Sequence, residues 1–268
     1  MPTAPSSSSG DGSDSVFAGS LFVLESAVVD RIGGDVDRQR LGSRNALAAA
    51  YLQAGQRDAA VPQFEATLTD ARRLLGPRDP DTLVAEGNLA AAYLMAEHDA
   101  VGLDLMVRNV ASRREIMGPE HPATLTAADA LATAHRLTGR AQESVTGHAD
   151  VAARRSRVLG PGHPDTLRSR AGQALATADA GNVTGAVDLL ADTLRAAEHF
   201  LGRPHPLSVA LRGYLAETLA AVGRTDPARD EFERAAADAE HLWGARAPET
   251  LRLRDELGAL AGQVRAAF

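Results

Sequence analysis

Three histidines that recur at a fixed spacing are the first candidates for chemistry in this sequence. His121, His163 and His205 lie 42 residues apart, each directly before a proline. Ligands of one zinc ion must lie about 2.0 to 2.1 Å from it, whereas packed helices are about 8 to 10 Å apart. Histidines on successive helix pairs therefore cannot share an ion, and we expect them to cap helices or to bond within loops.

Two acid and base pairs repeat with the same spacing. Glu198 with His199, and Glu240 with His241, precede two of the loops. We expect them to be exposed helix-end residues, because a positive charge suits the C-terminal end of a helix dipole. The sequence contains no nucleophile elbow, no glycine-rich phosphate loop and no HExxH motif. We therefore predict no catalytic residue, no metal site and no cofactor, and favour a binding protein over an enzyme.

The composition excludes several further kinds of chemistry. The 268 residues carry a formal charge of -7, which disfavours nucleic acid as a partner. There is no lysine, so a Walker A loop and a Schiff base are excluded. There is no cysteine either, which excludes disulfides and thiolates and is compatible with a cytoplasmic location.

The N-terminal region divides into two segments. Residues 1–15 are small and polar, and we predict a disordered tail. Residues 16–29 are apolar but include Glu25, and they are shorter than the roughly 20 residues of a membrane span. We therefore expect a helix from Val16 to Ile32 and no membrane insertion.

An internal repeat of 42 residues organises almost the whole chain. Similar loop segments recur with the sequences "LGPRDPDTL", "MGPEHPATL" and "LGPGHPDTL". Two columns of small residues keep the same register. The first column is Ala48, Ala90, Ala132, Ala174 and Ala216, and the second is Ala18, Ala60, Gly102, Ser144, Ala186 and Ala228. We predict one array of about six units over residues 16–268.

Each unit is predicted to form two antiparallel helices. Apolar residues follow a helical period in segments such as "TLVAEGNLAAAYL", and alanine favours helix. Glycines such as Gly139 suit the turn between the two helices, because glycine readily adopts positive φ. In "LGPGHPDTL", Gly160 suits the end of one helix and Pro164 the first turn of the next. We call the helix after this loop the first helix of a pair and its partner the second helix.

These features resemble the tetratricopeptide repeat, in its 42-residue kinesin light chain-like variety, which also occurs in bacterial regulators. The resemblance rests on "NLAAAY", "ALAAAYLQAG" and the loops quoted above. HEAT repeats have a similar length but would not explain both the small columns and the loop. The resemblance implies an all-α, right-handed superhelix of antiparallel helix pairs.

The resemblance also implies a concave groove, lined by the first helices, that holds a peptide segment of a partner protein. Asn45 and Asn88 would bond the peptide backbone. Tyr214 or the arginines would select its side chains. The predicted groove residues are Asn45, Asn88, Asp129, Arg136, Arg168, Asp179, Tyr214 and Glu217.

Two alternatives to a simple scaffold follow from the same residues. An enzyme or small-molecule receptor could use Asp129, Arg136, Asp179 and Glu217 together with a histidine. Self-association could occur through the apolar N-terminal helix or through the C-terminal end, because terminal repeats usually need a polar cap. A basic cluster of Arg113, Arg114, Arg154, Arg155 and Arg157 is expected to form a solvated surface, with contact to a phosphate or an acidic peptide as the alternative.

Overall fold

The computed structural model describes residues 36–266, with side chains described as far as Gly262. The described part is all-α, with eleven helices and no strand. The first helices are α2 (Val36–Gln53), α4 (Pro80–Met95), α6 (Pro122–Leu137), α8 (Pro164–Asp179), α10 (Pro206–Ala221) and α12 (Pro248–Ala266). The second helices are α3 (Arg57–Leu74), α5 (Asp99–Met117), α7 (Ala141–Leu159), α9 (Val183–Leu201) and α11 (Thr225–Trp243). The predicted tail and the predicted helix 16–32 lie outside the described residues.

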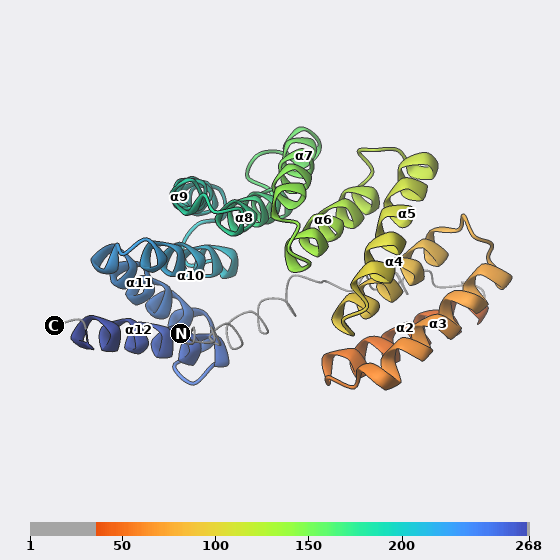
Figure 1. The fold of residues 1–268 in the computed structure, drawn as a ribbon, viewed down its shortest axis with the longest axis horizontal. Coiled ribbons are helices and arrows are strands. Elements are labelled where there is room, and N and C mark those ends of the chain that lie inside the picture. Colours follow the sequence, from red (N-terminus) through yellow and green to blue (C-terminus); the bar gives the residue numbers. More distant parts are fainter. Residues whose placement is uncertain (1–35, 267–268) are drawn as a thin grey trace, which may run out of the picture. The chain divides into compact units, whose positions relative to one another are not determined.

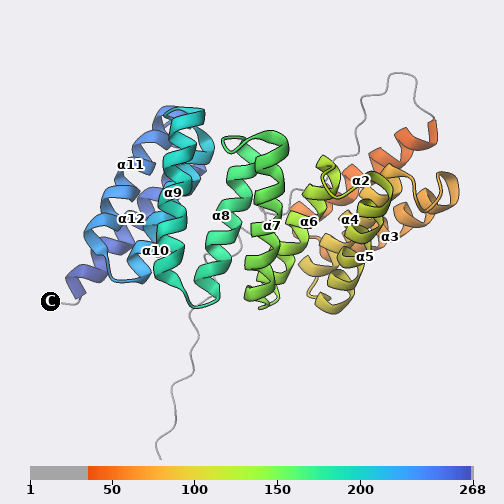
Figure 2. The same ribbon diagram turned by 90° about the horizontal axis from the view of Figure 1, so that it is seen from above.

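The chain divides into two compact units, one up to Thr133 and one from Ala134, so that the division falls within α6. In the first unit α2, α3, α4 and α5 pack in sequence, each against the next. In the second unit α7 to α12 do the same, and the first helices α8 and α10 also contact each other. Figures 1 and 2 show the successive helices of each unit running back and forth. The predicted antiparallel pairing is confirmed.

The small columns lie where helices meet. Ala48, Ala90 and Ala174 are fully buried, as are Ala60 and Ala186 of the other column. At Gly102 an added Cβ would be 2.9 Å from the carbonyl oxygen of Ala90, so the backbones of α4 and α5 approach closely there. The requirement for small residues is thus steric, because a larger side chain would push these backbones apart.

The predicted roles of glycine and proline at the helix ends are also confirmed. Gly160 ends α7 with φ of +96°. Pro164 then occupies the first turn of α8. Between first and second helices the turn glycines likewise have positive φ, except that Glu97 takes this conformation with φ of +63°.

The last helix is longer than the other first helices that begin at a proline. α12 continues to Ala266 and has 19 residues, whereas α4, α6, α8 and α10 have 16 each. The glycine that ends the equivalent helices, such as Gly223, is replaced by Arg265. Without that glycine the helix has no local signal to stop.

Candidate functional site

In the second unit an ion pair joins two of the predicted groove residues. Arg136, near the end of α6, donates from Nη1 to Oδ2 of Asp179 in α8 at 3.1 Å. The arginine side chain is largely buried, whereas the aspartate is 46% exposed. A largely buried guanidinium is thus held by a carboxylate that remains open to solvent.

A second ion pair joins the next two first helices. Glu217 of α10 lies 3.5 Å from Nη1 of Arg252 in α12. Burial raises the pKa of Glu217 to about 7, opposed by Arg252 and reinforced by the charge of Glu256. The arginine therefore compensates only part of the cost of removing this carboxylate from water. Arg252 and Glu256 were not among the predicted residues.

Tyr214 lies close enough to both ion pairs for their charges to affect the pKa of its phenol. Its side chain is buried in α10, and burial raises the pKa of its phenol. The negative charge of Glu217 raises this pKa further, while Arg136 and Arg252 lower it. The phenol therefore stays protonated at neutral pH and can donate a hydrogen bond.

Arg168 is the most exposed of the predicted residues in this unit. Its Nη1 donates to Oδ1 of Asp165 at 2.6 Å, one turn earlier on α8. A bond within one exposed helical turn contributes little to stability, so the guanidinium can exchange this carboxylate for another acceptor.

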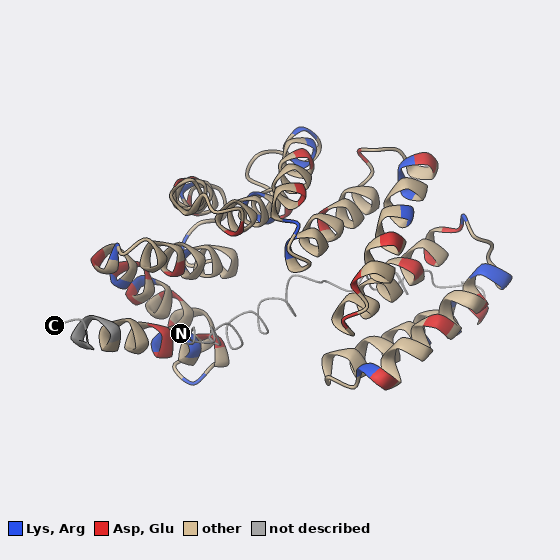
Figure 3. Cartoon of the chain, in the orientation of Figure 1, with Lys and Arg blue, Asp and Glu red and all other residues tan. Residues whose placement is uncertain are grey.

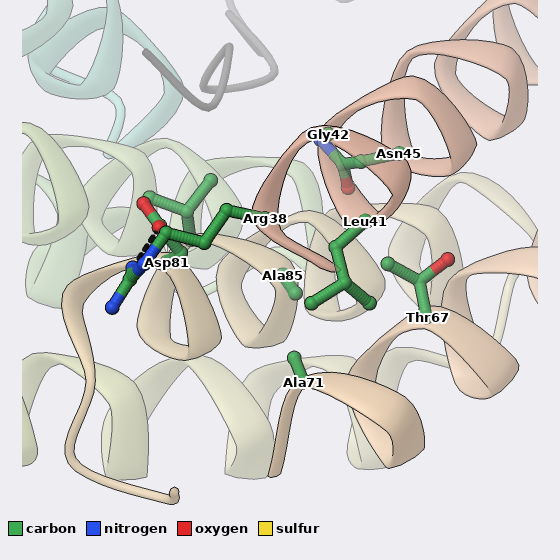
Figure 4. Close-up of a pocket in the computed structure, with 9 residues that line it drawn as sticks. Arg38, Leu41, Gly42, Asn45, Thr67, Ala71, Asp81 and Ala85 are labelled. Carbon is green, nitrogen blue, oxygen red and sulfur yellow. Dashed lines mark hydrogen bonds and ion pairs between the residues drawn. The ribbon is translucent and has the colours of Figure 1, made fainter. Parts of the chain in front are cut away.

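In the first unit Asn45 lines a small cavity between α2, α3 and α4. Thr67 and Ala71 contribute from α3, and Val84 and Ala85 from α4 (Figure 4). The cavity has a volume of about 20 Å³, enough for one water molecule. Asn45 is 5% exposed, and its Oδ1 has no hydrogen-bond partner among the described residues.

Arg38 also lines this cavity and is fixed by two carboxylates. Its Nη2 lies 2.7 Å from Oδ2 of Asp79, and its Nη1 pairs with Asp81 (Figure 4). Burial raises the pKa of Asp79, but the bond from Arg38 and that from the Asp81 backbone outweigh it and the pKa is lowered. Asp79 is therefore ionised at neutral pH.

The remaining two predicted residues lie apart from this cavity. Asn88 is buried in α4 at 3% exposure, and Asp129 is half-buried in α6. Neither lines the cavity beside Asn45. Buried amides such as Asn45 and Asn88 contact the helices beside them, and this burial is not visible in a single sequence.

The loop histidines are helix caps, as expected. The Nδ1 atoms of His121, His163 and His205 accept from backbone N–H groups two residues on, at 3.2, 3.1 and 3.1 Å. Asp79 makes the equivalent bond at 2.9 Å. No cluster of three or more potential metal ligands occurs within residues 36–262.

The predicted solvated arginine surface is wrong for two of its members. Arg113 is 1% exposed and donates to the carbonyl oxygens of Leu83 and Ala123 at 2.9 and 3.0 Å. Arg155 is 6% exposed and donates to the carbonyl oxygen of Asp165 and the hydroxyl of Ser169. These guanidinium groups donate hydrogen bonds to buried oxygen atoms, whose burial without a partner would destabilise the fold.

Comparison with known proteins identifies the repeat. Sequence profiles of the tetratricopeptide repeat match residues 39–101 and 124–165. The structure is similar to the nearly identical TPR-like repeats of a Podosopora anserina protein described as a kinesin light chain. The TM-score is 0.67 and the identity 29%, over 76% of this chain and 96% of the other. These matches support a tetratricopeptide repeat protein of the kinesin light chain-like type.

Two further solved structures share only the fold. BtubC (BKLC) of P. vanneervenii has 16% identity and a TM-score of 0.64, with 79% of this chain and 85% of the other covered. A thermophilic TPR protein of Thermus thermophilus has 20% identity and a TM-score of 0.57, with 82% and 98% covered. A comparison with curated proteins gives no match.

The charged residues of this repeat protein are of both signs. Figure 3 shows acidic and basic residues mixed along the helices of each unit. None of the helices in the described residues is long and apolar enough to cross a membrane. The tetratricopeptide repeat fold is commonly a protein-interaction scaffold, and its members typically bind protein partners.

Proposed function

We propose that this protein binds a peptide segment of a partner protein along its first helices, which continue as one array of about six units from residue 16 to 268. The proposed setting is a bacterial cytoplasm, which the lack of cysteine and the type of repeat support. The proposal requires neither a cofactor nor nucleic acid.

One observation carries the proposal. The first helices of the second unit are linked by the half-exposed ion pairs Arg136 with Asp179 and Arg252 with Glu217. Such pairs contribute only about 0 to 1 kcal/mol each. A peptide can replace one member of a pair at small cost, and preformed charges then determine which side chains it may carry.

The proposed contacts differ in burial, because Arg168 is exposed whereas Tyr214 and Asn88 are 8% and 3% exposed. Arg168 and Arg136 would donate to acidic groups of the peptide, and Tyr214 would donate from its phenol. Asn45 Oδ1, which has no partner beside its cavity, would accept a backbone N–H if the peptide displaced a water molecule. Asn88 and Asp129 are proposed as further contacts of the first unit.

The test compares two triple variants that carry the same number of alanines. Arg168→Ala, Asp179→Ala and Glu217→Ala together remove polar groups of the first helices. The control combines Asp188→Ala, Asp192→Ala and Arg195→Ala, all exposed on the second helix α9. Both are used with the wild type to capture proteins from a native lysate, after circular dichroism has established their folding.

We expect a protein that the wild type and the control enrich and that the first-helix variant loses by at least tenfold. Equal enrichment by all three proteins would exclude these helices as the binding surface. If no protein is enriched by the wild type, a metabolite ligand becomes the better hypothesis, and thermal shift assays with small molecules would follow.

A further inference from the structure

Within the described residues, no helix covers the surface of α2 that points away from α3 and α4. Ser43, Ala46 and Ala50 are exposed along this surface, and Leu47 is 50% exposed. These small and apolar residues recur every three or four positions, so they form one stripe along the helix. A stripe of this kind is typical of a packing surface.

The repeat shows what normally covers this stripe. The equivalent residues of α4, one period on, are Ala85, Asn88, Leu89 and Ala92, with exposures of 5, 3, 5 and 0%. The preceding second helix α3 packs on α4. In α10, which packs on α9, the equivalents Leu211, Tyr214, Leu215 and Thr218 are also buried. The stripe on α2 therefore lacks a preceding second helix.

We infer that residues 16–32 of the same chain, which lie outside the described residues, are the second helix that covers this stripe. Ala18 falls in the column of Ala60 and Ala186, which are fully buried. Phe22 falls in the column of the large core residues Phe64 and Phe232, which are 0 and 2% exposed. The segment thus has the register of a second helix.

The column of Phe22 also identifies its contact on α2. In the second unit His148 of this column lies against Gly172, where an added Cβ would be 2.6 Å from the imidazole Cε1. The residue equivalent to Gly172 is Ala46, in the middle of the uncovered stripe. A phenyl ring in this column does not require glycine opposite it, because Phe64 is fully buried although the residue equivalent to Ala46 in its repeat is the larger Asn88.

A recurring pattern of charge supports the same register within the repeats. Second and first helices are joined by ion pairs between Arg72 and Glu86 at 2.6 Å, between Glu198 and Arg212, and between Glu240 and Arg254 at 2.6 Å. The positions one period before Arg72 and Glu86 hold Asp30 and Arg44. These two residues have opposite charges, and Arg44, which pairs with Asp70 through Nη1 at 2.7 Å, can bond Asp30 as a second carboxylate.

The connection favours this segment over a second molecule. Only residues 33–35 separate it from the start of α2, a distance of at most about 14 Å of extended chain. Gly34 occupies the loop position at which Gly76 and Gly160 have positive φ. A tethered helix has a high effective concentration at its site, so it outcompetes an equivalent helix of another copy.

The absence of native cysteine permits a direct test by disulfide formation. The test variant of the full chain carries Phe22→Cys and Ala46→Cys. The control carries Leu24→Cys and Ala46→Cys, because the residues equivalent to Leu24, including Arg108 and Asp192, are exposed. Both are oxidised at low micromolar concentration and analysed by mass spectrometry and by gel electrophoresis without reductant.

We expect an intramolecular disulfide in most molecules of the test variant and at least fivefold less in the control. Equal linking in the two variants would overturn the register, and disulfide-linked dimers alone would assign the stripe to a second copy. Hydrogen exchange of cysteine-free protein provides an independent measurement. Removing residues 1–34 should raise amide exchange in α2 more than in α12, and unchanged exchange in α2 would contradict the inference.

Discussion

The imidazole of His148 on α7 lies directly against the backbone of Gly172 on α8. A Cβ added at residue 172 would be 2.6 Å from Cε1 of the ring, closer than real Cβ contacts. The histidine occupies the column filled elsewhere by Phe64, Met106 and Phe232. A large ring is accommodated here because the facing residue has no side chain.

We predict that Gly172→Ala lowers the free energy of unfolding by about 1 to 3 kcal/mol, because it overpacks this contact. In a His148→Ala background the same substitution should instead stabilise by up to about 1 kcal/mol, since alanine favours helix over glycine. Urea unfolding of the four proteins in this cycle measures both effects. A loss of equal size in both backgrounds would show that the imidazole does not cause it.

Glu97 is predicted to be replaceable with a gain in stability. It has φ of +63° at a position where the other repeats have glycine, as at Gly139. Glu97→Gly should raise the free energy of unfolding by about 1 kcal/mol, because glycine adopts this conformation without a steric penalty. Glu97→Ala is the control: it also removes the 3.4 Å pair with Arg57 but retains the strain. If alanine stabilised as much as glycine, the backbone conformation would not be the cause.

Arg212 is predicted to be essential to the packing of α9, α10 and α11. It is 3% exposed and pairs with Glu198, with Glu231 at 2.6 Å and with Asp238 at 3.5 Å. Arg212→Ala should cost about 3 to 5 kcal/mol, because it removes the buried partner of three half-buried carboxylates and leaves them only the more exposed Arg203 and Arg234. The equivalent but exposed Arg254 pairs with Glu240, and Arg254→Ala should cost no more than about 1 kcal/mol. Chemical unfolding of both variants gives the comparison, and similar costs would refute it.

Glu217 is predicted to make stability depend on pH between about 5 and 8. Burial raises its pKa from 4.5 to about 7 in the folded chain, so the folded state binds a proton that the unfolded state has released. The stabilisation that protonation of Glu217 gives to the folded state is fully present below pH 4.5 and is lost as the pH rises through 7. Glu217→Gln should therefore gain about 1 to 2 kcal/mol relative to wild type between pH 5 and pH 8, allowing for its partial exposure. Urea unfolding at both pH values tests this, and a pH-independent difference would exclude the titration of Glu217 as its source.

Much of the fold was predictable from local signals. The loop glycines and prolines mark helix ends through their own φ preferences, so Gly160 and Pro164 were assigned without knowing any neighbour. The capping role of His163 followed from its place before a proline. The small columns at Ala48 and Ala60 were predictable because every repeat makes the same contact. These features depend on one helix pair, and the period supplies several copies of each.

The candidate site was only partly predictable. Arg136, Asp179, Tyr214 and Glu217 were expected on one surface, and the structure adds the ion pair of Arg136 with Asp179. Arg252 was missed because its partner Glu217 lies on another helix, 35 residues earlier. A single sequence contains no signal for such a pair, since its formation depends on the reach of two side chains across a helix interface.

The sequence by itself determined the period, the helix ends that glycine and proline mark, and the residues that must stay small. Only the tertiary structure decided which polar groups are buried. The sequence predicts that Arg113 and Arg155 are exposed to solvent, yet both are buried and donate to backbone carbonyl oxygens. Asn45 is likewise buried in contact with its neighbours. The reason is physical: φ preferences and side-chain volume belong to a residue, whereas burial and ion pairing belong to the helices packed around it.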